Sequence, residues 1–249
     1  MKKNVLFSAL ILLFVYSCSD GLTDSDKELG DLKDPGAIRI GLINDNNDTT
    51  TPQRLQSLAA NTKMLNELGI SEFTITEITS AIDPDSLKEF TIIYLPVSWA
   101  ALTTPIYENI NDNAAQYMNY VKSGGSMFIE QPNPFNRPGN TITIDFLPYP
   151  VTLSNGYLDE EVTVVDSTHY ITTGLDGIDL PFPGDQVQDL PEQYTLLAEG
   201  TSSGYPSLFT LNHDDGKILF AMGHPSSTSV HPYSDAAYYK MLNWLTLAD

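Results

Sequence analysis

The sequence has 249 residues, with 12 Lys and Arg against 32 Asp and Glu, which gives a formal net charge of −20 at pH 7. Such an excess of negative charge argues against nucleic acid as a partner, because contacts from Lys and Arg to phosphates supply most of that binding. Hydrophobic residues make up 41% of the chain. This composition predicts one domain with a substantial core, over residues 37–249.

The N-terminal segment has the pattern of a secretory signal. Two lysines precede an apolar run from Val5 to Tyr16, and the run ends at Cys18, the single cysteine of the chain. A run of roughly a dozen residues is too short for a membrane span, which needs about 20. The motif Val15-Tyr16-Ser17-Cys18 resembles the lipobox of bacterial lipoproteins. We therefore predict a signal peptide over 1–17, lipid attachment (palmitate) at Cys18, and a membrane anchor without a membrane span.

Residues 18–36 are rich in Asp and Glu, poor in large apolar residues, and end in Pro35-Gly36. This composition predicts a flexible tether. Acidic residues directly behind a lipidated cysteine also resemble the surface-export signal of Bacteroidetes lipoproteins, and a merely solvated linker is the alternative. The expected location is the outer membrane, with the domain lipid-anchored on the cell surface or on the periplasmic face.

The first half of the domain alternates between short apolar runs and helical patterns. Predicted strands cover 37–43, 73–76, 91–95 and 126–130, and predicted helices cover 51–69 and 107–122. Strands that alternate with helices predict an α/β fold, with a mostly parallel sheet that is covered on both faces.

The second half is richer in Pro, Gly and aromatic residues. It contains a predicted strand at 162–165, and a hairpin of 207–211 with 217–222, whose turn carries an Asp-Gly pair. A last helix is predicted over 235–247. Its 3.6-residue pattern should bury four side chains against the sheet, namely Tyr238, Met241, Leu242 and Leu245.

Three phrases, in order, carry a family resemblance. They are VKSGGSMF at 121–128, THYITTGL at 168–175 and GKILFAMGHP at 216–225. Together they resemble class I glutamine amidotransferase-like domains, in the branch that is similar to trehalose-utilisation proteins. The resemblance covers about residues 37–247. It implies a flavodoxin-like, amidotransferase-like three-layer α/β sandwich with a mostly parallel central sheet, and with β-hairpin additions in the second half.

The resemblance also implies where a catalytic triad would lie. In active amidotransferases a cysteine follows the strand that corresponds to 126–130, and a closing His-Pro-Glu phrase supplies the other two members. Here the first place reads Glu130-Gln131-Pro132-Asn133, without Cys or Ser, and the closing phrase reads His224-Pro225-Ser226. Because cysteine catalysis needs a thiolate and an aligned base, we predict a pseudoenzyme that cannot hydrolyse glutamine by this route.

Ligands of open α/β sheets gather beyond the carboxyl ends of the strands. An aromatic ring beside planar polar groups suits a sugar, and the residues after the predicted strands offer this mixture. We therefore predict a carbohydrate site in nutrient use, although Trp99 also suits a core position and the Asn-rich segment suits simple turns and caps. The predicted ligand-binding residues are Asn44, Asp45, Asn46, Trp99, Glu130, Gln131, Asn133 and His224.

Two other functions remain open. Glu130 and His224 could form an acid/base pair of a hydrolase, acid/base or metal-assisted, with Asp45 and His169 as further polar partners. The four histidines show no H-x-x-x-H or H-x-H spacing, so no metal site and no cofactor are predicted. Alternatively, the domain is a scaffold among outer-membrane uptake proteins, and its aromatic segment 131–205 covers the cleft or presents a partner surface. The aromatic residues considered there are Phe135, Phe146, Tyr149, Tyr157 and Phe182.

Overall fold

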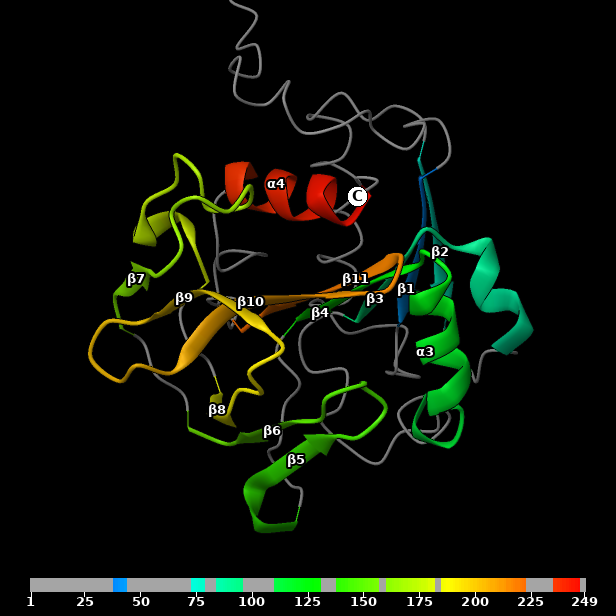
Figure 1. The fold of residues 1–249 in the computed structure, drawn as a ribbon, viewed down its shortest axis with the longest axis horizontal. Helices are drawn as coiled ribbons and strands as arrows, with labels where there is room; N and C mark the ends of the chain where they lie inside the picture. Colours follow the sequence, from blue (N-terminus) through cyan, green and yellow to red (C-terminus); the bar gives the residue numbers. More distant parts are fainter. Residues whose placement is uncertain are drawn as a thin grey trace, which may run out of the picture. The chain divides into compact units, whose positions relative to one another are not determined.

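The computed structural model describes most of the domain (Figure 1), as residues 38–43, 73–78, 84–95, 110–130, 138–156, 160–181, 185–222 and 235–246. These residues all belong to one compact unit, Asp31–Asp249. The predicted signal peptide, Cys18, the tether and the predicted helix 51–69 lie outside the described residues. Among the helices that are described, none has the length and apolar character to cross a membrane.

The main sheet has eight strands in the order β2-β1-β3-β4-β11-β10-β9-β7. Its first five strands pair in parallel. Strands β1, β3 and β4 are buried along almost their whole length, as expected for aliphatic strands that are covered on both faces. The bounds are β1 Ile38–Ile43, β2 Phe73–Ile78, β3 Ile92–Leu95, β4 Ser126–Glu130 and β11 Gly216–Ala221, and they confirm the strands predicted from the sequence.

The remaining strands of this sheet are antiparallel. They are β10 (Pro206–His213), β9 (Thr195–Gly200) and β7 (Val162–Val164). The predicted hairpin is confirmed as β10 and β11, with His213 paired to Gly216. Its turn lies one residue earlier than the Asp-Gly pair suggests, because Asp214 has the positive φ, 54°, and Gly216 already belongs to β11.

A second, three-stranded antiparallel sheet has the order β5-β6-β8. Its strands are β5 (Thr141–Ile144), β6 (Val151–Ser154) and β8 (Gln186–Asp189). The prediction of a three-layer sandwich with a mostly parallel central sheet is therefore wrong. The main sheet is mixed, and much of the second half of the chain builds a separate sheet. In the described residues β9, β10 and β11 follow one another through short turns, and such connections produce antiparallel pairs.

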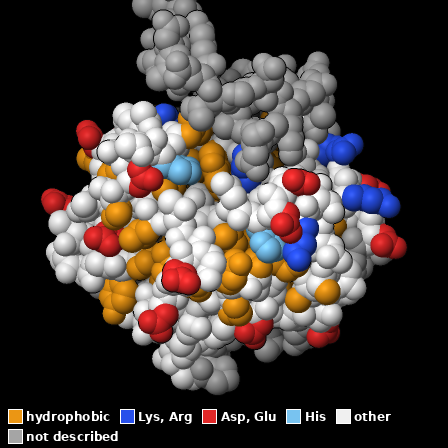
Figure 2. All heavy atoms as spheres, in the orientation of Figure 1, with side chains coloured by type: hydrophobic (Ala, Val, Ile, Leu, Met, Phe, Trp, Pro, Cys, Tyr) orange, Lys and Arg blue, Asp and Glu red, His pale blue; other side chains and the backbone are white. Residues whose placement is uncertain are grey.

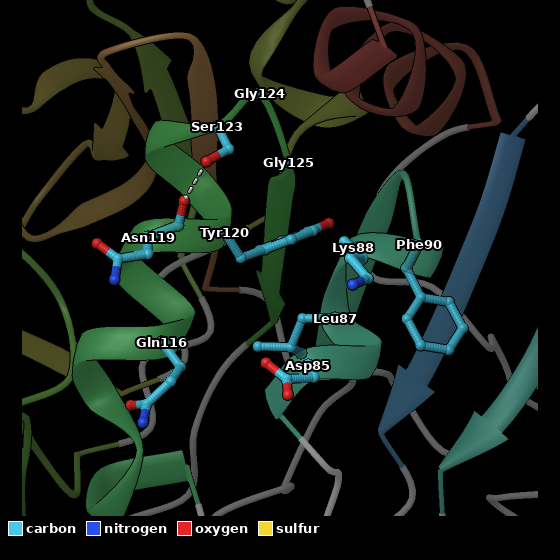
Figure 3. A pocket seen from close by; sticks show the side chains of 10 residues that line it. All are labelled: Asp85, Leu87, Lys88, Phe90, Gln116, Asn119, Tyr120, Ser123, Gly124 and Gly125. Carbon is cyan, nitrogen blue, oxygen red and sulfur yellow. Dashed lines mark hydrogen bonds between the residues drawn. The ribbon is translucent and has the colours of Figure 1, made fainter.

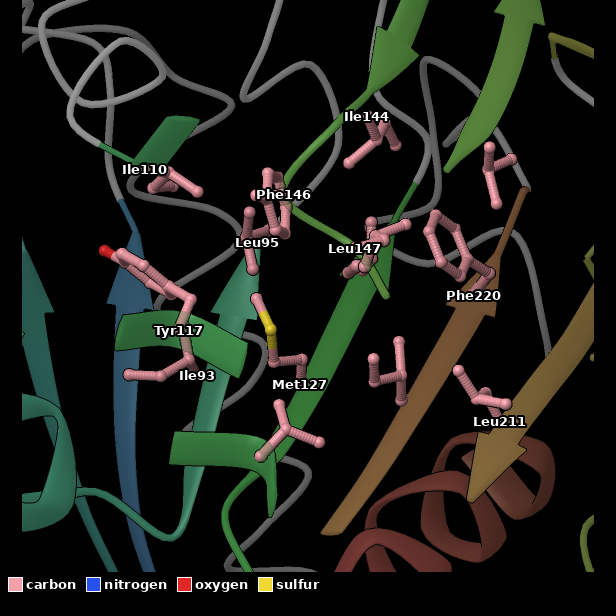
Figure 4. Close-up of a cluster of buried hydrophobic side chains, with 14 of the residues drawn as sticks. Ile93, Leu95, Ile110, Tyr117, Met127, Ile144, Phe146, Leu147, Leu211 and Phe220 are labelled. Carbon is pink, nitrogen blue, oxygen red and sulfur yellow. The ribbon is translucent and has the colours of Figure 1, made fainter. Parts of the chain in front are cut away.

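Helix α3 (Ala114–Lys122) and the second sheet pack on one face of the main sheet, around the cluster that Figure 4 shows. Helix α4 (Asp235–Thr246) packs on the other face. The four side chains predicted to be buried on α4 are at most 3% exposed, which confirms that prediction. Three short 3₁₀ helices complete the described elements: η3 (Pro84–Glu89), η4 (Pro138–Asn140) and η5 (Gly177–Asp179).

The outer strand β7 has η5 against it. A Cβ on Gly177 would lie 1.8 Å from the carbonyl oxygen of Val162, so only glycine allows this approach. The turn is braced because the backbone N–H of Asp176 donates to the Asp179 carboxylate at 3.1 Å. Ile178, between these two acids, is 92% exposed. A short turn thus lies against the outer strand of the main sheet.

Candidate functional site

Of the residues predicted to bind a ligand, Glu130 is the one that falls within the described residues. It ends strand β4, where its register partner on β11 is Ala221, and it is 3% exposed. This places it at the carboxyl end of a central strand, as predicted. The others lie outside the described residues, and so does the predicted lipidation site: Asn44, Asp45, Asn46, Trp99, Gln131, Asn133, His224 and Cys18.

Glu130 lies near the phenol of Tyr238 on α4. Burial raises the pKa of Tyr238 well above its ordinary value, and the charge of Glu130 adds to that rise. The phenol therefore keeps its proton at any physiological pH and can act as a hydrogen-bond donor beside a carboxylate. Glu130 and Tyr238 thus bring a carboxylate and a phenol together at the carboxyl end of β4.

His169 lies at the opposite end of the sheet. Its ring centroid is 5.6 Å from that of Trp244, and the Nζ of Lys217 is 5.3 Å from the same Trp ring. Lys217 is paired with Ser126, the first residue of β4, whereas Glu130 is the last. Four strand steps separate the two ends by roughly 13 Å. The structure therefore does not bring His169 to Glu130, and the predicted partnership in a hydrolase site is wrong for this residue.

The phrase 168–175 forms a turn that holds α4 in place. The Asp166 carboxylate accepts hydrogen bonds from the backbone N–H and the hydroxyl of Thr168, at 2.9 and 2.7 Å, and these bonds lower its pKa. Lys240 of α4 donates through Nζ to the carbonyl oxygen of Thr173 at 2.8 Å and lies over the ring of Tyr170. The motif that supports the family resemblance thus has a structural role in this chain.

A pH dependence of stability follows from His169. Its Nδ1 accepts the backbone N–H of Ile171 at 3.2 Å. Burial lowers the pKa of His169; the Asp166 carboxylate opposes this and the Lys217 ammonium adds to it. The folded state therefore resists protonation that the unfolded chain accepts near pH 6.5, so stability should fall as pH drops through this value.

The measurement is urea unfolding at about pH 7.5 and about pH 5.5, on the wild type and on His169→Gln. Glutamine cannot titrate, so the variant should lose less stability than the wild type over this interval. Equal losses in the two proteins would contradict the assignment of this pH dependence to His169.

A cavity of about 390 Å³ lies between η3 and α3 (Figure 3). It opens beside Gly124 and Gly125, which precede β4, so it lies at the amino end of that strand and away from the predicted site. Sequence reasoning missed it. One feature of the sequence could have indicated the cavity. Gln116 and Asn119 are three residues apart in a predicted helix, and this spacing puts them on one face of it.

In the part of the chain that the structure describes, no group of three or more His, Cys, Asp or Glu side chains is arranged to hold a metal ion. The described polar clusters are instead built for hydrogen bonding. One example is Glu160, whose carboxylate accepts the backbone N–H groups of Ser202 and Ser203 at 2.9 and 3.1 Å and thereby closes the turn between β9 and β10.

No protein-family model matches the sequence, and no curated protein matches it significantly. Solved structures do show a similar fold. A ThuA-like protein from Bacteroides uniformis has a TM-score of 0.52 at 13% identity, over 87% of this chain and 94% of that chain. A cytoplasmic protein from Salmonella typhimurium LT2 has a TM-score of 0.52 at 13% identity, over 84% and 97%. The domain named mmIFT52 N-terminal domain has a TM-score of 0.51 at 15% identity, over 85% and 98%.

At these identities the comparison concerns the fold alone. It is consistent with the expected likeness to ThuA-like proteins at that level, while the relationship to trehalose utilisation and to the wider amidotransferase-like class stays a prediction. Proteins of such different descriptions share the architecture because function resides in sites on a fold, not in the fold itself. The fold of this chain is thus similar to that of the ThuA-like protein.

Proposed function

We propose that this protein is a lipid-anchored lipoprotein of the outer membrane whose ThuA-like domain binds carbohydrate, or a related small ligand, in nutrient use. The N-terminal charges, the short apolar run and the lipobox-like motif ending at Cys18 support the anchor. The acidic segment 18–36 supports a tether that holds the domain away from the bilayer. In this role the domain works beside uptake proteins in the same membrane.

Glu130 is the observation that carries the binding proposal. This carboxylate is 3% exposed and lies at the carboxyl end of a central parallel strand, the edge of an α/β sheet where ligands gather. Loops from neighbouring strands converge at such ends. In the sequence Glu130 is followed by Gln131 and Asn133, whose carboxamides offer the paired donors and acceptors that sugar hydroxyls use.

Catalysis by the amidotransferase route is not proposed. The segment after β4 offers neither Cys nor Ser at the nucleophile position, and the closing phrase has Ser226 where the family has Glu. A buried acid with neighbouring amides suits recognition, because each group can orient a hydroxyl without any bond being broken. We therefore regard the domain as a pseudoenzyme that binds its ligand.

Glu130→Gln tests the site. The substitution preserves size and removes the charge, so we expect the affinity for a responsive glycan to fall about tenfold, in line with the loss of a charge-assisted hydrogen bond. The measurement is isothermal titration of the full-length chain in detergent with trehalose, maltose, cellobiose and xylobiose. Glu161→Gln, at an exposed carboxylate beside β7, is the matched control and should bind as the wild type does. Absence of heat with every glycan would refute carbohydrate binding.

Cys18→Ser tests the anchor separately. Without the thiol no acyl chains can be attached, so the variant should incorporate no labelled palmitate and should leave the membrane fraction, whereas the wild type should incorporate the label and stay with the membrane. Labelling of the two proteins to the same extent would show that another residue, or none, carries the lipid.

A further inference from the structure

The cavity between η3 and α3 has an apolar floor. Phe90 supplies a half-buried ring to this floor, Tyr120 is 8% exposed and presents only part of its ring, and Leu87, 1% exposed, lies beneath them. The Tyr120 hydroxyl donates to the carbonyl oxygen of Ser126 at 3.1 Å, and its ring packs against the backbone of Gly125. Burial raises the pKa of this phenol. The residue therefore offers the cavity an uncharged aromatic surface.

The rim of the same cavity is polar and exposed. Helix α3 contributes Gln116 and Asn119, and Ser123 follows the helix, where its hydroxyl donates to the backbone oxygen of Asn119 at 2.8 Å. On the other side η3 contributes Asp85 and Lys88 (Figure 3). The lining thus includes amide and hydroxyl residues together with two charged residues of opposite sign.

The charge of the surroundings restricts the kind of ligand. Acidic side chains are spread over the face that Figure 2 shows, and the chain has a net charge of −20. This field repels anions. A cation in the cavity would be attracted by the carboxylate of Asp85 and repelled by the ammonium of Lys88, so it would gain little binding energy from the lining. A neutral ligand with several hydroxyl groups suits the rim, because carboxamides and opposite charges both donate to and accept from hydroxyls.

The size also fits. Small-molecule sites commonly measure about 300–1,000 Å³, so a cavity of about 390 Å³ lies at the lower end and can hold one sugar ring. An apolar floor and a polar rim match the two kinds of surface on a pyranose, which are C–H patches and hydroxyl edges. The cavity therefore has the mixture of groups that the sequence led us to expect at the other end of the sheet.

We propose that the η3–α3 cavity is a saccharide subsite that takes one neutral sugar ring, separate from the carboxyl edge at Glu130. This assignment rests on the proposed carbohydrate function, and it gives that function a second location. Two subsites on one domain would let two chains of one branched glycan be held at once, which strengthens weak individual contacts.

The test is titration of the full-length chain in detergent with maltose, cellobiose and xylobiose, on the wild type and on the double variant Gln116→Ala/Asn119→Ala. Both positions are exposed on a helix, and alanine favours helix, so the fold should persist; circular dichroism checks this. Loss of two carboxamides should weaken binding at this subsite about tenfold.

A pair of lysine variants provides a matched control. Lys88→Ala and Lys122→Ala each remove one positive charge from an exposed position, but only Lys88 lines the cavity. The proposal requires weaker binding with Lys88→Ala and no change with Lys122→Ala. Equal effects would mean that the overall charge, and not the cavity, is responsible, and would overturn the assignment.

The outcomes separate this proposal from the proposed function. The subsite is supported if the double variant Gln116→Ala/Asn119→Ala binds glycan more weakly than the wild type, and if adding Glu130→Gln to it weakens binding further. A wild type that binds glycan, with a double variant that binds it equally well, overturns the subsite and leaves carbohydrate binding intact. A wild type that binds no glycan overturns both. Amide shifts of Gly124 and Gly125 in an NMR titration place the ligand directly, and their absence during saturable binding counts against the cavity.

Discussion

Phe220→Ala is expected to lower the free energy of unfolding by about 3–5 kcal/mol, the range found when large core side chains are truncated. Phe220 is fully buried. Its ring is stacked on that of Phe209, with the centroids 4.6 Å apart, and Tyr194 meets it edge-on at 6.2 Å. The cluster joins the main sheet to the second sheet (Figure 4), so the cavity left by alanine would weaken both.

Urea denaturation followed by circular dichroism measures this change. Ile178→Ala is the control, because this side chain is 92% exposed and its truncation should alter stability by no more than about 0.5 kcal/mol. A loss below about 1 kcal/mol in Phe220→Ala would show that the aromatic cluster is not the centre of the core.

Gly216→Ala should cost about 2–3 kcal/mol, or prevent folding, because there is no room for a methyl group. A Cβ at this position would lie 2.0 Å from the carbonyl oxygen of Val121 and 2.3 Å from that of Gly125. Both obstacles are backbone atoms, which cannot rotate away as a side chain can. Relief would require β11 to move away from the end of α3 and the start of β4.

The matched control is Gly174→Ala. Gly174 has a φ of +72°, and no atom lies within 4 Å of the place that a Cβ would take. Alanine there meets conformational strain alone and should cost about 1–2 kcal/mol. The difference between the two variants, measured by urea unfolding, isolates the steric contribution. If Gly216→Ala proves as stable as Gly174→Ala, the close approach of the three backbone segments is wrong.

The sequence predicted the local elements and the β10–β11 hairpin, but it did not predict the second sheet or the antiparallel strands at one side of the main sheet. Strands 126–130 and 217–222 and the final helix were visible because their apolar residues are continuous or repeat with a helical period. The second sheet was missed because β5 and β6 have only four residues each, with Thr and Ser between the apolar positions. For strands joined by long segments, the direction of pairing depends on how the chain returns to the sheet, and the local pattern of apolar residues does not record this.

The candidate site shows a similar division. The position of Glu130 at a strand end could be predicted, because strand 126–130 was clear and strand ends are where ligands gather. Its proximity to Tyr238 could not, because that depends on how α4 crosses the sheet. The η3–α3 cavity could not be predicted for a different reason. In the sequence, Gln116 and Asn119 have the pattern of a solvent-exposed helix face, and only the structure shows that η3 lies beside this helix.

The turn η5 also determines how two copies of the protein can meet. An open strand edge is a template for pairing with another chain, and natural proteins block such edges. Here Gly177 sits against the Val162 carbonyl, and Asp176 and Asp179 add negative charge on either side of it. Neighbouring copies approaching β7 would meet like charges and a blocked backbone, so this edge discourages side-by-side polymerisation.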